Sequence, residues 1–338
     1  MSATPAPAAR TLLEVNDLKK HFALGGGLLG RQTRVLKAVD GLSFTVARGE
    51  TLSLVGESGC GKSTVAKALM RLYAPTAGQV VLDGRRIDDL SAGALRPLRR
   101  HIQMVFQDPF SSLNPRMRVR AILAEPIRNF GLAHNAADLE SRLASLMERV
   151  GLPREALGRY PHEFSGGQRQ RIGIARALAA EPDLIICDEA VSALDVSVKA
   201  QIVNLLRDLQ RELDLAMLFI SHDLAIAEHM THRVAVMYLG KIVEIGPRRD
   251  LFLAPKHPYT QALLSAVPIP EPGAGRTRIV LKGDVPSPIN PPSGCRFHTR
   301  CPHAFDRCRT EVPGLDPVGA GHFAACHLND VAAPARAA

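Results

Sequence analysis

Residues 56–64 carry the pattern with the clearest chemistry in the sequence, a glycine-rich loop that ends in lysine, serine and threonine. The loop residues are Gly56, Glu57, Ser58, Gly59, Cys60, Gly61, Lys62, Ser63 and Thr64. Glycine has no Cβ, so successive backbone N–H groups can turn inward around phosphate oxygens. In such a loop the lysine ammonium meets the β- and γ-phosphates, and the serine hydroxyl is a ligand for Mg²⁺. The loop therefore predicts a binding site for a nucleoside triphosphate.

Two carboxylates follow an apolar run at residues 184–190, which reads LIICDEA. The apolar run predicts a buried strand, and ligands of open α/β sheets bind at the carboxyl ends of strands. Asp188 is placed there to hold Mg²⁺ directly or through water, and Glu189 to polarise an attacking water. Gln107 and His222 end two other predicted strands, so we expect them at the same sheet edge.

A second glycine-containing segment, at residues 164–171, reads FSGGQRQR and precedes a predicted helix at residues 172–180. Its polar and glycine residues are Ser165, Gly166, Gly167 and Gln168. The segment predicts a second anion site at a helix N-terminus, although no lysine follows the glycines. Two anion sites in one chain indicate that they serve different nucleotides.

Alternating strands and helices are needed to position these groups. Apolar, β-branched runs predict strands at residues 51–55, 101–106, 184–187 and 216–220. The proline-punctuated stretch that begins at residue 108 contains amphipathic helices, the best of them at residues 137–150, and predicts a helical subdomain. The alternation predicts an α/β fold with a mostly parallel sheet and helices on its faces.

Composition limits the class of protein. With 338 residues, the chain suits one large domain and a small one, and its 46% apolar and 22% charged residues are globular values. The net charge of +9 permits nucleic-acid binding, but there is no run of five basic residues and aromatic residues are only 4%. Attraction to a phosphate ligand and to an anionic membrane face explains the charge as well. We therefore expect no nucleic-acid partner.

The ends and the linkers have a different composition. Residues 1–10 are rich in alanine and proline and are predicted to be disordered, and PIPEPGAG at residues 268–275 predicts a linker. Glycine-rich residues 25–30 predict a loop between two strands. The start lacks a signal peptide, and no stretch of about eighteen apolar residues occurs. We expect a cytosolic chain that does not span a membrane.

The order of Phe22 and these motifs along the chain resembles that in the ATP-binding subunits of ABC transporters, and the resemblance covers roughly residues 11–265. The resemblance implies a P-loop NTPase fold, an ABC-type nucleotide-binding domain with an antiparallel β subdomain and a helical subdomain at about residues 108–180. A small Cys-rich C-terminal domain would follow from residue 266, as a regulatory or metal-binding tail of the peptide-transporter type.

The resemblance also implies a role for each motif in ATP hydrolysis. Phe22 would stack on adenine, and the loop at residues 56–64 would hold the phosphates of ATP. Asp188 and Glu189 would be the metal ligand and the catalytic base, and His222 would contact the γ-phosphate.

Other motifs imply partners. Gln107 would touch Mg²⁺ and report on a membrane permease built from two transmembrane subunits. Residues 165–168 would close on ATP held by a paired ATPase subunit, and Asp195 would belong to the loop that spans this dimer. The chain would then lie at the cytoplasmic face of the inner membrane, with an extracytoplasmic peptide-binding protein as an indirect partner.

Three later segments narrow the resemblance to the peptide-uptake subfamily, whose relatives also handle nickel or glutathione. Residues 107–117 read QDPFSSLNPRM, and residues 257–268 read HPYTQALLSAVP. Residues 284–295 read DVPSPINPPSGC and are similar to the F-type member of the two paired ATPases. From physical arguments alone, residues 257–268 predict a capped amphipathic helix. A soluble ABC-type ATPase is the alternative, although such proteins usually carry two nucleotide domains or a long coiled coil. A module without turnover would lack part of the polar set, which is complete here.

Four of the six cysteines, Cys295, Cys301, Cys308 and Cys326, lie in a proline-rich region with few large apolar side chains. Such a segment cannot bury much core, so a four-thiolate centre would supply folding energy. Thiolate sites suit a [4Fe-4S] cluster or Zn²⁺. The Cys301-Pro302 pair favours a cluster, the absence of any C-x-x-C pair disfavours a zinc ribbon, and the resemblance likewise implies a four-iron cluster.

Zinc, or no metal, stays open as an alternative to the cluster. A histidine could replace one thiolate, and the candidates are His298, His303, His322 and His327. The other two cysteines, Cys60 and Cys187, are predicted to be small packing residues. We expect the tail to fold on a core separate from the core that supports residues 56–64.

Overall fold

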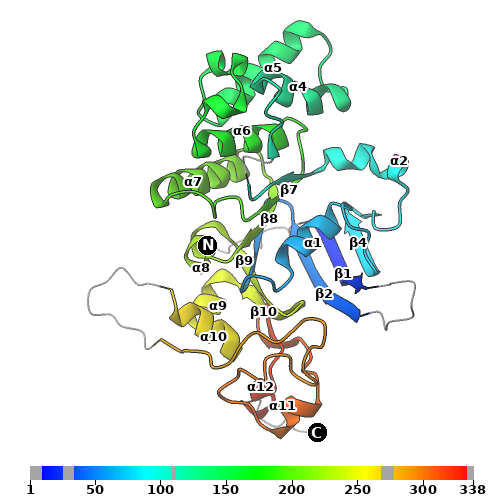
Figure 1. Cartoon of the computed structure of the whole chain (residues 1–338), viewed down its shortest axis with the longest axis vertical. Helices are drawn as coiled ribbons and strands as arrows, with labels where there is room; N and C mark the ends of the chain where they lie inside the picture. Colours follow the sequence, from blue (N-terminus) through cyan, green and yellow to red (C-terminus); the bar gives the residue numbers. More distant parts are fainter. Residues whose placement is uncertain (1–9, 26–33, 109–111, 268–277, 333–338) are drawn as a thin grey trace, which may run out of the picture. The chain divides into compact units, whose positions relative to one another are not determined.

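The computed structural model describes residues 10–25, 34–108, 112–267 and 278–332 (Figure 1). The disorder predicted for residues 1–9, most of the glycine-rich loop at 25–30, the linker at 268–275 and part of the 107–117 segment lie outside these residues. None of the helices in the described ranges has the length and apolar composition that a membrane span requires. The chain divides into two compact units, each made of several stretches of sequence.

The first unit comprises residues 1–15, 44–51 and 79–218. Its helices are α2 (Ala92–Leu95), η1 (Pro97–Arg100), α4 (Val119–Asn129), α5 (Ala136–Arg149), η2 (Arg154–Gly158), η3 (Pro161–Glu163), α6 (Gly166–Leu178) and α7 (Val196–Glu212). Helices α4, α5 and α6 pack on one another, in the green region of Figure 1. Helix α5 lies within one residue of its predicted bounds, because Asn135 caps it and a continuous apolar stripe from Leu139 to Met147 is buried.

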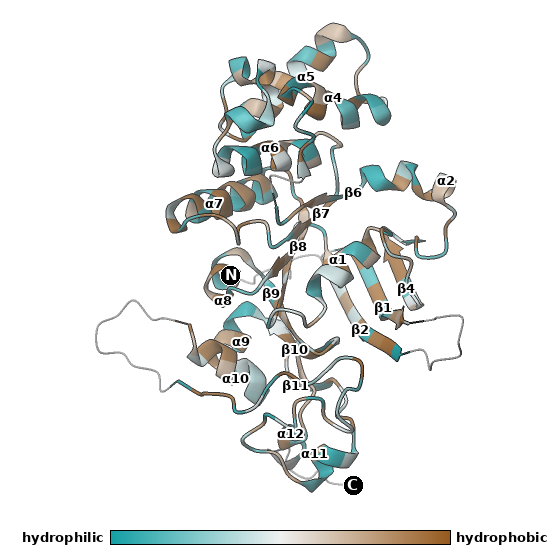
Figure 2. Ribbon diagram, viewed as in Figure 1, coloured by the Kyte–Doolittle hydropathy of each residue, from teal (hydrophilic) through white to brown (hydrophobic). Residues whose placement is uncertain are grey.

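Two strands of the first unit carry predicted polar site residues at or just after their carboxyl ends. Strand β6 (Ile102–Val105) pairs in parallel with β7 (Leu184–Asp188), as the alternation of strands and helices predicts. Figure 2 colours β7 as largely hydrophobic, and every residue of this strand is buried. Strand β4 (Ala77–Leu82) forms a hairpin with β5 (Arg85–Arg86), and Asp83 and Gly84 at its turn both have positive φ. An Asp-Gly pair directly after a short apolar strand is typical of a hairpin turn, so the sequence predicts this turn and the structure confirms it.

The second unit comprises residues 16–43, 52–78 and 219–338. Five of its strands are neighbours in the order β11 (Asp316–Gly319), β12 (His322–Ala324), β10 (Lys241–Pro247), β9 (Arg233–Tyr238), β3 (Thr51–Val55). The β3–β9 pair is parallel and the other pairs are antiparallel. The helices are α1 (Lys62–Leu69), α8 (Leu224–Met230), α9 (Arg248–Leu253), α10 (Pro258–Ser265), α11 (Asp306–Thr310) and α12 (Leu328–Ala332). Five strands contribute residues to both units, namely β3, β4, β1 (Thr11–Leu24), β2 (Arg34–Ala47) and β8 (Ala216–Ser221).

The C-terminal tail shares the core of the second unit. Phe297 is 1% exposed and belongs to the same buried cluster as Val55, the last residue of β3. Its ring centroid lies 5.3 Å from those of Tyr238 and Tyr259, which are themselves 4.7 Å apart. Strand β12 of the tail also extends the sheet by pairing with β10. The expectation of a separate core is wrong, because the tail compensates for its few apolar residues by inserting Phe297 into an existing core.

A buried polar network joins the tail to helix α10. The Glu244 side chain, which is fully buried, accepts hydrogen bonds from the backbone N–H groups of Lys256 (2.7 Å) and His257 (3.0 Å) and lies 2.8 Å from His322 Nε2. His257 Nδ1 accepts from the Tyr259 N–H and so caps α10, which confirms the capped helix predicted at this segment. Burial lowers the pKa of His257 to about 4.

This network predicts a loss of stability in mild acid. The folded-state pKa of His257 lies below the value of about 6.5 expected in the unfolded chain, so the contribution is complete above that value and falls as the pH drops toward 4. About 2 kcal/mol of unfolding free energy should be lost between roughly pH 7 and pH 5. Denaturant titrations across this range measure the slope. His257→Asn keeps a capping oxygen but does not titrate, so it should flatten the slope, and the exposed His134→Asn should not. An unchanged slope in His257→Asn would locate the proton uptake elsewhere.

Candidate nucleotide site

The loop at residues 56–64 follows the buried strand β3 and runs into α1, which begins at Lys62. Gly56 (φ 155°) and Gly61 (φ 110°) adopt backbone conformations that other residues rarely reach. A Cβ would lie 2.2 Å from the Met237 carbonyl oxygen at Gly56, and 2.1 Å from the Ala38 carbonyl oxygen at Gly61. Both glycines are therefore needed for the loop to close as it does.

Lys62 is buried at the start of α1. Its Nζ donates to the carbonyl oxygens of Gly56 (2.8 Å) and Glu57 (3.0 Å), so the ammonium lies within the curve of the loop. Cys60 is also buried, as is Cys187 in β7, and burial raises the pKa of both thiols. The two cysteines are small packing residues, as predicted.

Glu57 contacts two residues that sequence reasoning did not select. Its carboxylate forms a bidentate ion pair with Arg300 of the tail, with N–O distances of 2.7 and 3.1 Å. Its backbone N–H donates to the Tyr259 hydroxyl at 3.0 Å. No local pattern could have indicated these contacts, because the partners lie more than 200 positions away in the sequence.

Phe22 and His222 also belong to the second unit. The ring of Phe22, on β1, makes an edge-to-face contact with Tyr73 at 5.4 Å between centroids, and the Lys20 ammonium lies 4.9 Å from its centre. An aromatic surface of this kind can stack on a base. His222 is exposed and follows the last residue of β8, at the strand end where it was predicted.

The first unit brings Gln107 and Glu189 together. Gln107 Nε2 donates to Glu189 Oε2 at 3.0 Å, since the two residues follow the parallel strands β6 and β7. Asp188 is the buried last residue of β7. Glu189 has a φ of 47°, and non-glycine residues in such conformations are common at functional sites. Two neighbouring carboxylates and an amide that bonds one of them are side chains that could hold a metal ion and activate water beside a phosphate.

Residues 165–168 start α6, six residues earlier than the predicted helix. The Ser165 hydroxyl accepts from the Gln168 N–H, and the Gln168 side chain accepts from the Ser165 N–H, which is a capping box. A Cβ on Gly167 would lie 2.4 Å from Val198 Cγ1, so glycine permits the close packing of α6 on α7. Asp195 caps α7 by accepting from the Val198 N–H at 2.9 Å. These contacts give structural roles to Ser165, Gly167, Gln168 and Asp195, in addition to any contact with a nucleotide.

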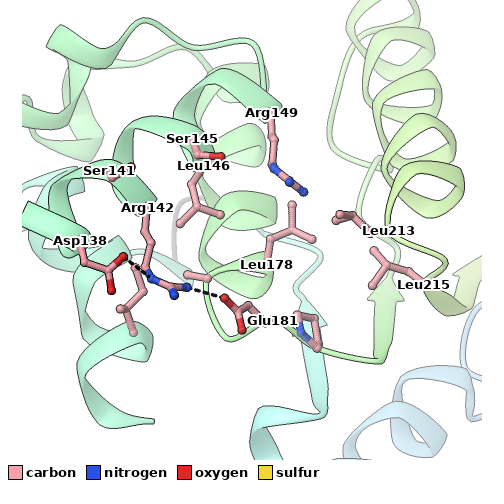
Figure 3. Close-up of a pocket in the computed structure, with 13 residues that line it drawn as sticks. Asp138, Ser141, Arg142, Ser145, Leu146, Arg149, Leu178, Glu181, Leu213 and Leu215 are labelled. Carbon is pink, nitrogen blue, oxygen red and sulfur yellow. Dashed lines mark hydrogen bonds and ion pairs between the residues drawn. The ribbon is translucent and has the colours of Figure 1, made fainter. Parts of the chain in front are cut away.

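A cavity of about 510 Å³ in the first unit lies apart from the predicted residues (Figure 3). Its lining comes from α4, α5, the C-terminal end of α6 and the segments that follow α6 and α7. Within it, Arg142 bridges Asp138 and Glu181. None of the predicted nucleotide or metal residues lines this cavity.

The described residues include no group of three or more His, Cys, Asp or Glu side chains arranged to hold a metal ion. The [4Fe-4S] cluster predicted for Cys295, Cys301, Cys308 and Cys326 is therefore not supported by this arrangement. One reason to expect a metal was that the tail has few apolar residues to stabilise its fold. The shared aromatic core and the ion pairs of the tail provide that stabilisation instead.

Three of the four candidate histidine ligands have other partners. His322 contacts Glu244, His327 bonds the Glu311 carbonyl oxygen, and His298 bonds the Cys295 carbonyl oxygen.

Comparison with known proteins identifies the chain. The sequence matches the family described as ABC transporter over residues 39–192, and the family described as Oligopeptide/dipeptide transporter, C-terminal region, over residues 243–308. It is 56% identical to a probable peptide ABC transporter ATP-binding protein, y4tS, of Sinorhizobium fredii, across 97% of this chain and 92% of that protein. The chain belongs to the ATP-binding proteins of ABC transporters.

Further ABC proteins agree with this assignment. The oligopeptide transport ATP-binding protein AppF of Bacillus subtilis is 53% identical across 94% of this chain and 97% of its own length. A dimeric structure of the ATP-binding cassette MJ0796 bound to ADP and Pi is 27% identical, with a TM-score of 0.63 over 70% of this chain and 99% of that chain. The predicted α/β fold of the P-loop ABC ATPases is confirmed.

Proposed function

We propose that this chain is the ATP-hydrolysing subunit that powers import of di- or oligopeptides through a membrane permease. The observation that carries the proposal is the presence of both family regions in one chain, the ABC transporter region and the oligopeptide/dipeptide C-terminal region. Relatives with peptide or oligopeptide transport in their names match over most of its length. Nickel or glutathione, handled by relatives of the subfamily, are the alternative cargoes. The length of the match to transport proteins argues against a soluble ABC-type ATPase.

In this proposal, residues 56–64 bind the ATP phosphates, with Lys62 on the β- and γ-phosphates and Ser63 on Mg²⁺. Asp188 and Gln107 complete the Mg²⁺ site, whose hard oxygen ligands suit that ion. Bound Mg²⁺ would neutralise charge that develops on the phosphoryl oxygens.

Glu189 is the proposed base, and its hydrogen bond from Gln107 supports the assignment because it orients the carboxylate. His222 contacts the γ-phosphate, and Phe22 stacks on adenine. The exposure of His222 and the aromatic pair at Phe22 are consistent with these roles.

The base assignment predicts that Glu189→Gln retains ATP binding but loses steady-state hydrolysis by roughly two to three orders of magnitude, because only water activation is removed. Lys62→Ala should instead weaken ATP binding at least about tenfold, because a charged hydrogen-bond donor to the phosphates is lost. Nucleotide titration and phosphate release measure the two effects separately. Near-normal turnover in Glu189→Gln, or unchanged ATP affinity in Lys62→Ala, would contradict the respective assignment.

We also propose that the chain pairs with a second, related ATPase subunit, itself being the F-type member, and that two ATP molecules lie between them. Residues 165–168 would act on ATP of the partner, and Asp195 would lie in the loop between the two sites. The dimeric ABC structure with bound ADP and Pi supports this arrangement. Two permease subunits would hold the pair at the cytoplasmic face of the membrane, and a peptide-binding protein would deliver the cargo.

For this role we propose a functional division of the chain near residue 265, with the nucleotide domain before it and the regulatory tail after it. The net charge of +9 suits a peripheral position beside anionic lipid.

The pairing predicts that Ser165→Arg blocks hydrolysis by the assembled transporter but leaves ATP binding at this chain's own loop. The arginine is too large for a surface that must close on the partner's nucleotide. Ser91→Arg is a matched control, because Ser91 also caps a helix, α2, and is not part of the proposed site. Equilibrium ATP binding and ATPase rates of both variants give the answer. Loss of own-site binding in Ser165→Arg alone would point to a different role for the segment.

We further propose, on the strength of its donor atoms, that the tail binds iron or zinc through its four thiols. Burial is the main cause that raises the pKa of Cys295, Cys301 and Cys326, and neighbouring cysteines raise it further. The Cys295 backbone N–H donates to the Cys308 carbonyl oxygen at 2.9 Å, so these two cysteines are neighbours in the fold. Backbone hydrogen bonds act in the opposite direction and favour the thiolates. Metal binding would require these side chains to move from their described positions.

Metal analysis tests this directly. Anaerobically purified protein should contain about four irons per chain and absorb near 400 nm, as thiolate-to-iron charge transfer does. Cys301→Ser should lower the metal content, because one of four ligands is lost. One zinc per chain without colour would replace the cluster with a zinc site. Folded protein with neither metal would remove the proposal.

A further inference from the structure

We propose that Arg300 is a positioning residue for the nucleotide site, which neutralises Glu57 and keeps its carboxylate turned away from the bound phosphates. The inference rests on the proposed function in one respect, that residues 56–64 bind the phosphates of ATP. It assigns the C-terminal tail a direct part in ATP binding.

The carboxylate, the backbone N–H and the carbonyl oxygen of Glu57 each have a partner. Its carboxylate receives both Nη atoms of Arg300, at 2.7 and 3.1 Å, and its N–H donates to the Tyr259 hydroxyl at 3.0 Å. Its carbonyl oxygen accepts from Lys62 Nζ at 3.0 Å. Tyr259 and Arg300 both come from the region matched by the oligopeptide/dipeptide C-terminal family. The region matched by the C-terminal family therefore contacts the second residue of the loop at two points.

The Arg300–Glu57 pair is shielded from water. The Arg300 side chain is 8% exposed and that of Glu57 is 29% exposed. The Arg300 guanidinium lies 5.9 Å from the ring centre of Tyr238, in the aromatic cluster that contains Phe297 and Tyr259. The backbone N–H of Arg300 also donates to the Phe297 carbonyl oxygen at 3.0 Å. A pair in such a place is screened less than a surface ion pair, and removal of one partner leaves a poorly solvated charge.

The charge of Glu57 explains why a partner is needed. A carboxylate within a loop that binds a triphosphate opposes the ligand, because like charges about 8 Å apart at a protein surface repel enough to change affinity roughly tenfold or more. The guanidinium cancels this charge and keeps the carboxylate turned to the tail. Binding of ATP then depends on a residue 243 positions from Glu57.

Charge variants distinguish this role from simple structural support. Arg300→Gln should raise the Kd and KM for ATP about tenfold, with kcat changed less than about threefold, because repulsion by Glu57 acts on binding. Glu57→Gln should bind ATP at least as tightly as the unchanged chain, because the repelling charge is gone. The double variant Glu57→Gln with Arg300→Gln should return to within about threefold of the unchanged chain.

Arg307→Gln is the matched control, because Arg307 forms a bidentate pair with Glu311 in the same tail, at 2.6 and 2.9 Å, on the exposed surface. It removes the same charge and should leave ATP affinity unchanged. Thermal unfolding of each variant reports folding, and Arg300→Lys keeps the charge if Arg300→Gln does not fold. Equal weakening by Arg300→Gln and Glu57→Gln, or no rescue in the double variant, would overturn the inference. Absence of ATP binding in the unchanged chain would instead overturn the proposed function.

Discussion

The loop at residues 56–64 closes as it does because two backbone carbonyl oxygens leave room for a glycine hydrogen but not for a Cβ. The oxygens of Ala38 and Met237 approach Gly61 and Gly56 so closely that any Cβ would overlap them. These carbonyls belong to strands β2 and β9, which lie far apart in the sequence. The loop is thus shaped by strands on either side of it, and its glycines are the condition for that approach.

Buried charge is the second constraint on the same unit. Lys62, Glu244 and Arg300 are each withdrawn from water, and each is met by atoms of opposite polarity. Burial of a charge is tolerated only with such partners. Glu244 satisfies this by accepting hydrogen bonds from the backbone N–H groups of Lys256 and His257, directly before α10, and by contacting His322 of the tail, so one carboxylate joins these elements.

Local patterns in the sequence predicted local structure well. The bounds of α5 followed from an unbroken apolar stripe, the β4–β5 turn from Asp83-Gly84, and the neighbouring ends of β6 and β7 from apolar runs followed by polar residues. The early start of α6 was missed, although Ser165 and Gln168 have the spacing of a capping box. The support of Glu57 by Arg300 and Tyr259 could not be predicted, because it depends on tertiary contacts without a local signal. The core that the tail shares with the second unit was missed for a similar reason. The sequence around Phe297 has no apolar pattern that indicates where this side chain packs.

The ion pair between Glu57 and Arg300 joins two regions of the chain that match different sequence families. One family region ends at residue 192 and the other begins at residue 243, which makes the tail look like an interchangeable module. A recombination event between those positions would bring together a loop and a tail with separate histories. Chimeras of peptide-transporter ATPases should therefore bind ATP as tightly as their parents only when the donor of the loop and the donor of the tail carry compatible charges at these two positions.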